Sequence, residues 1–158
     1  MVEHDRTAAR EAFEAALALS PSSALTYNLG AIQLGFAGEA ERAIEWGERA
    51  LRLSPFDPWS YVGWHGVFLG HFPHARYEEA ANAARKSIQV NPGFSISHMF
   101  LAAALAKLGR IDEAKAAASR VLALQPRFSI AEWCAATDPV PAIAVPLSDA
   151  LRAAGLPE

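Results

Sequence analysis

Residues 47–55 read GERALRLSP, and close variants of this phrase occur at three other places in the chain. The variants are AFEAALALSP at 12–21, ARKSIQVNP at 84–92 and ASRVLALQP at 118–126. The prolines that end the four phrases are spaced by 34 (55−21), 37 (92−55) and 34 (126−92) residues. A repeat of about 34 residues is typical of stacked helix–turn–helix units, in which each unit packs on its neighbours. The sequence therefore predicts an all-α solenoid.

The composition narrows the classes of partner and compartment. Hydrophobic residues make up 52% of the 158 residues, which argues against a disordered chain. The net charge is −3 and no block of Lys or Arg stands out, so we expect neither nucleic acid nor a membrane as a partner. The N-terminus carries charges where a signal peptide needs an apolar run, and no stretch approaches the roughly 20 apolar residues of a spanning helix. Cys134 is the only cysteine, which excludes an internal disulfide and favours a reducing, cytoplasmic location.

Apolar residues recur every three or four positions through most of the chain, as they do in amphipathic helices. This spacing predicts helices over 6–19, 23–36, 39–53, 57–71, 76–90, 94–108, 111–124, 128–136 and 147–154. Ser23 is expected to cap the second of these helices, and Asp57 the fourth, with Pro58 at its first helical position. The three prolines within 138–146 are expected to prevent a regular helix there.

One of the predicted helices, over 57–71, is rich in aromatic residues. Trp64, Phe68 and Phe72 recur every four residues, which predicts a stripe that faces the core. Trp59 falls on another face of the same helix, where the core and the surface are equally good interpretations.

The four phrases and the turns between them resemble tetratricopeptide repeats. The pattern of that family has a large residue, a Leu-Gly pair, a Gly turn, an Ala, a second Ala seven residues later and a Pro five residues after it. The matching residues are Ala9, Phe13, Ala16 and Pro21 in the leading phrase; Tyr27, Asn28, Leu29, Gly30, Gly38, Ala43, Ala50 and Pro55 in repeat one; Ala80, Ser87 and Pro92 in repeat two; and Leu101, Ala102, Leu105, Gly109, Ala114, Val121 and Pro126 in repeat three.

The resemblance implies a right-handed α–α superhelix of about three and a half repeats, followed by a capping segment. The array would cover 1–126, as a lone second helix at 6–19 and repeats at about 23–55, 57–92 and 94–126, and the tail 127–158 would cover the last apolar face. Repeat two has three extra residues near GHFPHA and has Ala75 at the Gly turn position. Repeat one has one extra residue between Leu29 and Gly38, which leaves its register open by one position.

Two short stretches have a second resemblance. The wording HARYEEA at 74–80 and the ending LRAAGLPE at 151–158 look like the C-terminal repeat region of bacterial class III adenylate and guanylate cyclases. In those proteins a cyclase domain precedes the repeats, so the resemblance implies a regulatory or assembly module in signal transduction. No residue of this chain matches the metal-binding or nucleotide-binding residues of the cyclase domain. Because the first phrase lacks a preceding helix, we expect the chain to be a fragment of a longer protein.

The resemblance also implies a binding groove lined by the first helix of each repeat. The residues expected to contact a partner are Tyr27, Asn28, Ala31, Leu34, Trp59, Val62, Ile96, Met99, Phe100 and Lys107, with Ala24, Gly63, Gly66 and Ala103 beside them. The set is mostly apolar, so it needs a cover: the chain's own tail, a second copy, an upstream part of the parent protein, or an amphipathic segment of another protein. The alternative is that some of these residues are buried between repeats and bind no partner. Only Asn28 and Lys107 suit the terminal carboxylate of a peptide, which argues against that binding mode.

Candidates for chemistry are few. His65, His71 and His74 lie near the extra turn, but no cysteine accompanies them, and a solvated or capping turn explains them better than a metal site. Because no phosphate-binding glycine loop and no nucleophile motif is present, we expect no catalytic residue, no metal and no cofactor. The sequence therefore favours a protein–protein interaction module, either as part of a cyclase-like protein or as a free-standing adaptor that binds a peptide or itself. An enzyme is the third hypothesis.

Overall fold

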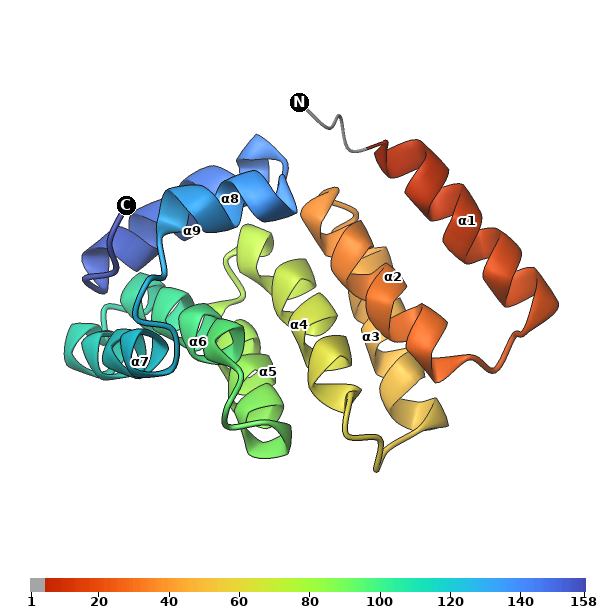
Figure 1. Cartoon of the computed structure of the whole chain (residues 1–158), viewed down its shortest axis with the longest axis horizontal. Helices are drawn as coiled ribbons and strands as arrows, with labels where there is room; N and C mark the ends of the chain where they lie inside the picture. Colours follow the sequence, from red (N-terminus) through yellow and green to blue (C-terminus); the bar gives the residue numbers. More distant parts are fainter. Residues whose placement is uncertain (1–4) are drawn as a thin grey trace.

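The computed structural model describes residues 5–158, and this part of the chain contains only helices and the turns between them. The helices are α1 (Arg6–Leu19), α2 (Ala24–Phe36), α3 (Ala40–Leu53), α4 (Ser60–His71), η1 (a 3-10 turn, Phe72–His74), α5 (Tyr77–Val90), α6 (Ser95–Lys107), α7 (Ile111–Leu124), α8 (Ile130–Thr137) and α9 (Pro141–Ala153). Successive helices from α1 to α7 stack side by side, and α8 and α9 fold back over the array (Figure 1). The predicted α–α solenoid is confirmed.

Within the array, α2, α4 and α6 are the first helices of the repeats, and α1, α3, α5 and α7 are the second helices. Local chemistry sets their ends. The Ser23 hydroxyl accepts a hydrogen bond from the Thr26 backbone N–H at 3.2 Å, as predicted for an N-cap. Gly38 and Gly109 end first helices with φ of 81° and 75°. Ala75 takes the same left-handed conformation, with φ of 58°, so the predicted turn position of repeat two is confirmed.

Two predicted helix starts are wrong, both near prolines. The Asp57 carboxylate accepts from the Trp59 N–H at 2.8 Å, which forms a turn, and α4 begins only at Ser60, so Pro58 is not helical. At the other end of the chain, α9 begins at Pro141 and runs through Pro146.

The α9 helix tolerates Pro146 for a local and a tertiary reason. Pro146 cannot donate to the carbonyl four residues earlier, on Ala142, but Ala142 is exposed, so water can hydrogen-bond to that carbonyl. On the other side of the helix, Ile143, Leu147 and Leu151 are fully buried. The burial of this apolar side therefore outweighs the loss of one backbone hydrogen bond.

The spacing between repeats depends on side-chain size. Between α2 and α4 the backbones approach closely: a Cβ added to Gly66 would lie 2.4 Å from the Cβ of Ala31. Between α4 and α6 the contact is aromatic, because the Phe68 and Phe100 rings stack with centroids 4.3 Å apart. Phenyl rings hold α4 and α6 further apart than glycine and alanine hold α2 and α4.

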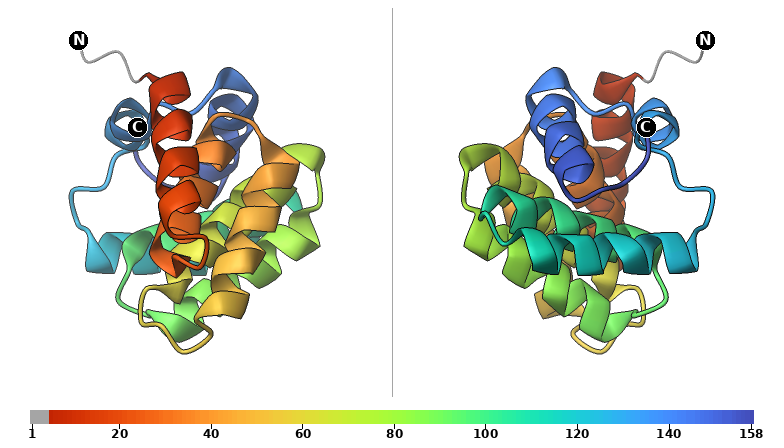
Figure 2. Two further views of the ribbon diagram at one scale, coloured as in Figure 1. Left: turned by 90° about the vertical axis from the view of Figure 1, so that its right-hand side faces the viewer. Right: turned by 90° about the vertical axis from the view of Figure 1, so that its left-hand side faces the viewer.

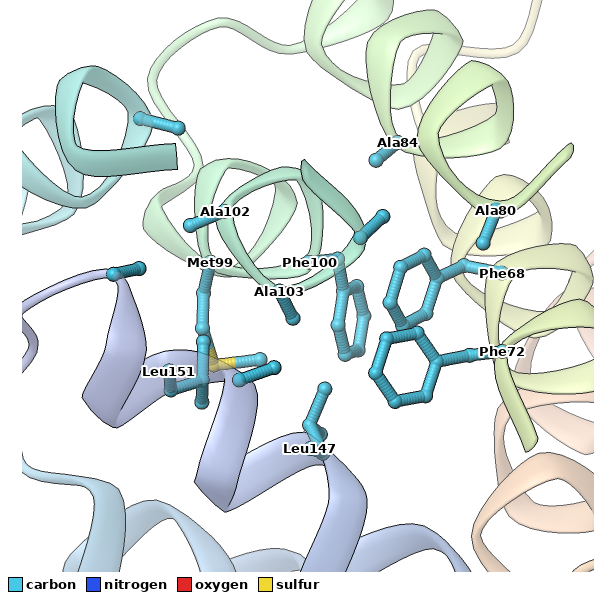
Figure 3. Packing of buried hydrophobic residues seen from close by; sticks show 14 of the residues in the cluster. Phe68, Phe72, Ala80, Ala84, Met99, Phe100, Ala102, Ala103, Leu147 and Leu151 are labelled. Carbon is cyan, nitrogen blue, oxygen red and sulfur yellow. The ribbon is translucent and has the colours of Figure 1, made fainter. Parts of the chain in front are cut away.

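The main core lies between α4, α6 and α9. Phe68 and Phe72 are buried there, as predicted, and Trp64 is half-buried with the Lys86 ammonium 4.4 Å from its ring. Figure 3 shows Phe68, Phe72 and Phe100 side by side, with Leu147 and Leu151 of α9 approaching them and Met99. The tail and the array therefore share one hydrophobic core.

The tail also reaches the first repeat. The Val140 N–H donates to the Phe36 carbonyl at 2.9 Å, and the Trp133 ring lies 5.8 Å from the Phe36 ring. Arg6 pairs with Asp138, 132 residues away in sequence. Both panels of Figure 2 show α8 and α9 on the side of the molecule away from α5. In repeat arrays contacts ordinarily join neighbouring repeats, whereas this tail connects the last repeat to the first.

Candidate functional site

The predicted partner-binding residues of repeat one do not lie on one surface. Tyr27, Ala31 and Leu34 pack with Ala43 and Trp46 in a cluster between α2 and α3. Ala31 and Leu34 are buried in the interior of the repeat, and Tyr27 is half-buried against the Trp46 ring. The face next to them carries Leu25, Leu29, Ile32 and Phe36, of which Leu25 and Leu29 are exposed and Phe36 contacts the tail. The sequence left the register of repeat one open by one position. The face that was expected at Ala24, Asn28 and Ala31 lies one residue further along the chain, at Leu25, Leu29 and Ile32.

Asn28 is also placed inside the protein. Its side chain is buried, and its Oδ1 has no hydrogen-bond donor. A Cβ on Gly63 would lie 2.5 Å from this oxygen, so α4 covers Asn28 directly. Of the two residues that suit a peptide carboxylate, Asn28 is therefore out of reach and Lys107 is half-buried at the end of α6.

In repeats two and three, the tail covers part of the predicted set. Met99 and Phe100 are fully buried, with α9 lying over them (Figure 3). Val62 is buried as well, Ile96 is half-buried, and Trp59 is 56% exposed. A partner can reach Trp59 and Ile96 without moving any helix. That these residues bind a partner stays a prediction.

A group of aromatic residues lies where α4 and α6 begin. Trp59 stacks on Tyr61 with ring centroids 6.0 Å apart, and Tyr61 contacts Phe94 at 5.0 Å. Phe56, in the turn before α4, is 97% exposed. We call these four residues the aromatic edge. Phe56 was missed by the sequence reasoning, because a turn residue belongs to no helical pattern.

A buried polar cluster joins α4, α5 and α6. The His65 Nε2 lies 2.8 Å from the Ser97 hydroxyl and 2.9 Å from the Ser87 hydroxyl, which donates to the Tyr61 carbonyl at 3.2 Å. The His65 ring is almost completely buried, and burial lowers its pKa from 6.5 to about 3. The imidazole is therefore neutral at pH 7 and satisfied by hydroxyls, as a structural histidine is.

The histidines do not converge on a metal site. His74 is exposed and His71 is half-buried, with its pKa lowered mainly by burial. Within residues 5–158, no three His, Cys, Asp or Glu side chains are placed to hold a metal ion together. In the same part of the chain, no helix has the length and apolar character needed to cross a membrane.

Comparison with known proteins agrees with this geometry. Two family models described as tetratricopeptide repeat match the chain, at residues 3–58 and 74–133. The chain belongs to the tetratricopeptide repeat family. Among solved structures, this tetratricopeptide repeat protein is similar to the crystal structure of MamA, with a TM-score of 0.67 and 18% identity over 95% of this chain and 86% of that one. That likeness concerns the fold.

A second solved structure is a more distant match. It is that of YrrB, described as a TPR protein with an unusual peptide-binding site, with a TM-score of 0.41 and 17% identity over 92% of this chain and 93% of that one. No curated protein matches the sequence.

Proposed function

We propose that the chain is a protein–protein interaction module whose partner supplies an apolar or amphipathic segment. Membership of the tetratricopeptide repeat family supports binding rather than catalysis. The observation that carries the proposal is the aromatic edge, where Trp59 is 56% exposed although it stacks on Tyr61. Aromatic side chains that are held in place but left exposed are typical anchors for partners. Covering one large apolar side chain contributes about 1.5–3 kcal/mol.

The partner-binding surface proposed here is smaller than the one predicted from sequence. Trp59, Ile96 and Lys107 remain in it, since all three are at least partly exposed. The tail occupies the surface over Met99 and Phe100, so a partner contacts those residues only if α9 is displaced.

The finer hypothesis, a regulatory or assembly module of a cyclase-like protein, rests on residues 74–80 and 151–158 alone. Packing offers another reason for several of these residues, because Ala80, Leu151 and Leu156 are buried. The native reading frame upstream of this segment tests the hypothesis. A catalytic domain whose regulation changes when residues 6–126 are deleted supports it, and a frame without such a domain refutes it.

Selection from a phage-displayed library of random peptides tests the binding role. Selected peptides should bind the full chain and lose about tenfold or more in affinity when Trp59→Asp is introduced. Val145→Asp is the matched control, because Val145 on α9 is 59% exposed and lies outside the aromatic edge. Selected peptides that bind both variants equally, or a library that yields no binder, would contradict the proposed surface.

A further inference from the structure

The tail contacts the array as a helix that lies in an apolar groove. Leu147 and Leu151 are one turn apart on the same side of α9, and both are fully buried. In Figure 3, Leu147 points towards Phe72 and Phe100, and Leu151 lies beside Met99. Apolar side chains at this spacing are typical of a helix bound in a hydrophobic groove. We call the surface formed by Phe72, Met99 and Phe100 the helix groove.

Part of the helix groove comes from the irregular turn of repeat two. Repeats one and three join their two helices through residues 37–39 and 108–110, whereas repeat two uses residues 72–76, which include η1. The η1 turn packs against α9, and its Phe72 ring stacks on the Phe68 ring with centroids 5.2 Å apart. The residues that break the repeat pattern therefore contact the tail.

The tail is tied together within itself. The Ile130 N–H donates to the Pro157 carbonyl at 2.9 Å, which joins the start of α8 to the residues after α9. The Cys134 Sγ on α8 lies 3.6 Å from the Ser148 hydroxyl on α9. Before α8, residues 125–127 form an exposed turn. A segment that is tied together in this way and joined to the rest through an exposed turn can open as one unit.

The hydrogen bonds from the tail to the repeats are concentrated in the turn before α9. Within residues 5–158, the Val140 N–H donates to the Phe36 carbonyl, and the Arg6 guanidinium donates to Asp138. Both side chains of the Arg6–Asp138 ion pair are exposed, so water weakens their attraction. The remaining contacts of the tail with the repeats are apolar. Apolar contacts are not directional, so another apolar helix can replace them.

The α9 helix depends on the array for its helical form. Pro146 removes one backbone hydrogen bond from the middle of the helix and is strongly unfavourable in an isolated helix. With 13 residues, α9 is also marginal as a helix on its own in water. A displaced tail therefore loses its helix, whereas a partner helix without a proline is ordered in the groove at a smaller cost.

We propose that the tail is a latch that opens as a unit while the repeats stay folded, and that the helix groove then binds an amphipathic helix of another protein. The latch covers a second binding surface, separate from the aromatic edge. The partner helix carries large apolar residues at the spacing of Leu147 and Leu151, because the lining of the groove is apolar. Without a partner the tail occupies the groove, because its covalent link to the array gives it a high effective concentration there.

Hydrogen exchange of the full chain tests whether the tail opens as a unit. The backbone amides of α8 and α9 should share a protection that is about tenfold or more below that of α4 and α6. Arg6→Ala should lower the protection of α8 and α9 by a further factor of about two to five. Arg52→Ala is the matched control, because it removes an exposed ion pair within α3, and it should leave the tail unchanged. Equal protection of α9 and α6 in the wild type would overturn the proposal, since the tail would then open only when the whole chain unfolds.

A fluorescent peptide of residues 138–158 tests the groove, with binding followed by fluorescence anisotropy. Because the chain's own tail competes with the peptide, Leu147→Asp in the full chain should tighten peptide binding about tenfold or more. Arg6→Ala, which leaves the buried core intact, should tighten it about twofold to fivefold. In the peptide itself, Leu147→Asp should abolish binding. Val145→Asp in the peptide should not, because Val145 is 59% exposed and lies about 200° around the helix from Leu147.

Equal binding of the peptide to the wild type and to Arg6→Ala, or equal binding of the two altered peptides, would overturn the proposal. Circular dichroism shows whether Leu147→Asp keeps the fold, and Arg6→Ala decides the outcome if it does not. Trp59→Asp should change neither measurement, because the helix groove and the aromatic edge share no residue. Failure of the latch is therefore distinguishable from failure of the aromatic edge.

Discussion

Acid should destabilise the fold through His65. The ring centroids of Tyr61, Phe94 and Phe100 lie 5.7, 5.6 and 5.1 Å from that of His65, and burial alone accounts for its lowered pKa of about 3. The folded protein therefore keeps His65 neutral, whereas the unfolded chain binds a proton below its ordinary pKa of 6.5. The stability contributed by the neutral ring is complete above pH 6.5 and is lost progressively as the pH falls towards 3.

The size of the effect follows from the two pKa values. Between pH 7 and pH 5, protonation of the unfolded chain at this one site lowers the free energy of unfolding by about 2 kcal/mol. His71 changes stability in the same direction, because burial also lowers its pKa. The measurement must therefore compare the wild type with a variant that lacks only the His65 proton site.

Urea unfolding followed by tryptophan fluorescence at pH 7 and pH 5 makes this comparison. His65→Gln keeps a polar group near Ser87 and Ser97 but does not titrate. The wild type should lose about 2 kcal/mol more than His65→Gln between the two pH values. Equal losses in the two proteins would show that the ring is solvated or already charged in the folded state, and would refute the reasoning.

Two further predictions concern packing, and both are measured as free energies of unfolding in urea. Gly66→Ala should destabilise by about 1–3 kcal/mol, although alanine is the better helix former, because its Cβ would lie 2.4 Å from that of Ala31; Gly93→Ala, with no atom nearer than 3.6 Å, should be close to neutral. Leu147→Ala should cost about 2–5 kcal/mol, since the side chain is fully buried, whereas Val145→Ala, 59% exposed, should change little; equal effects would place α9 outside the core.

Much of the fold follows from local chemistry. The Ser23 cap and the turns at Gly38 and Gly109 act within a few residues, so the sequence alone locates the ends of α1 and α7 and the break after α2. The period of the proline phrases then predicts how the helix pairs stack, because each repeat contacts mainly its neighbours.

Which apolar residues are exposed depends on contacts that the period does not specify. A shift of one residue turns a helix by about 100°, so only the packing of Ala31 and Leu34 against α3 shows that Leu25 and Leu29 are the exposed residues of α2. Sequence spacing alone permits either register.

The sequence by itself determined the repeat period, the helix pairs and the apolar character of their faces, since these depend on residues close together in the chain. Only the tertiary structure decided that α9 continues through Pro146 and that the tail joins Phe36 to Val140. It also decided which apolar faces are covered by the tail and which, on α1 and at Trp59, are left to water. The physical reason is that burial is summed over the whole fold, so no local segment carries enough information to specify which of its apolar sides is covered.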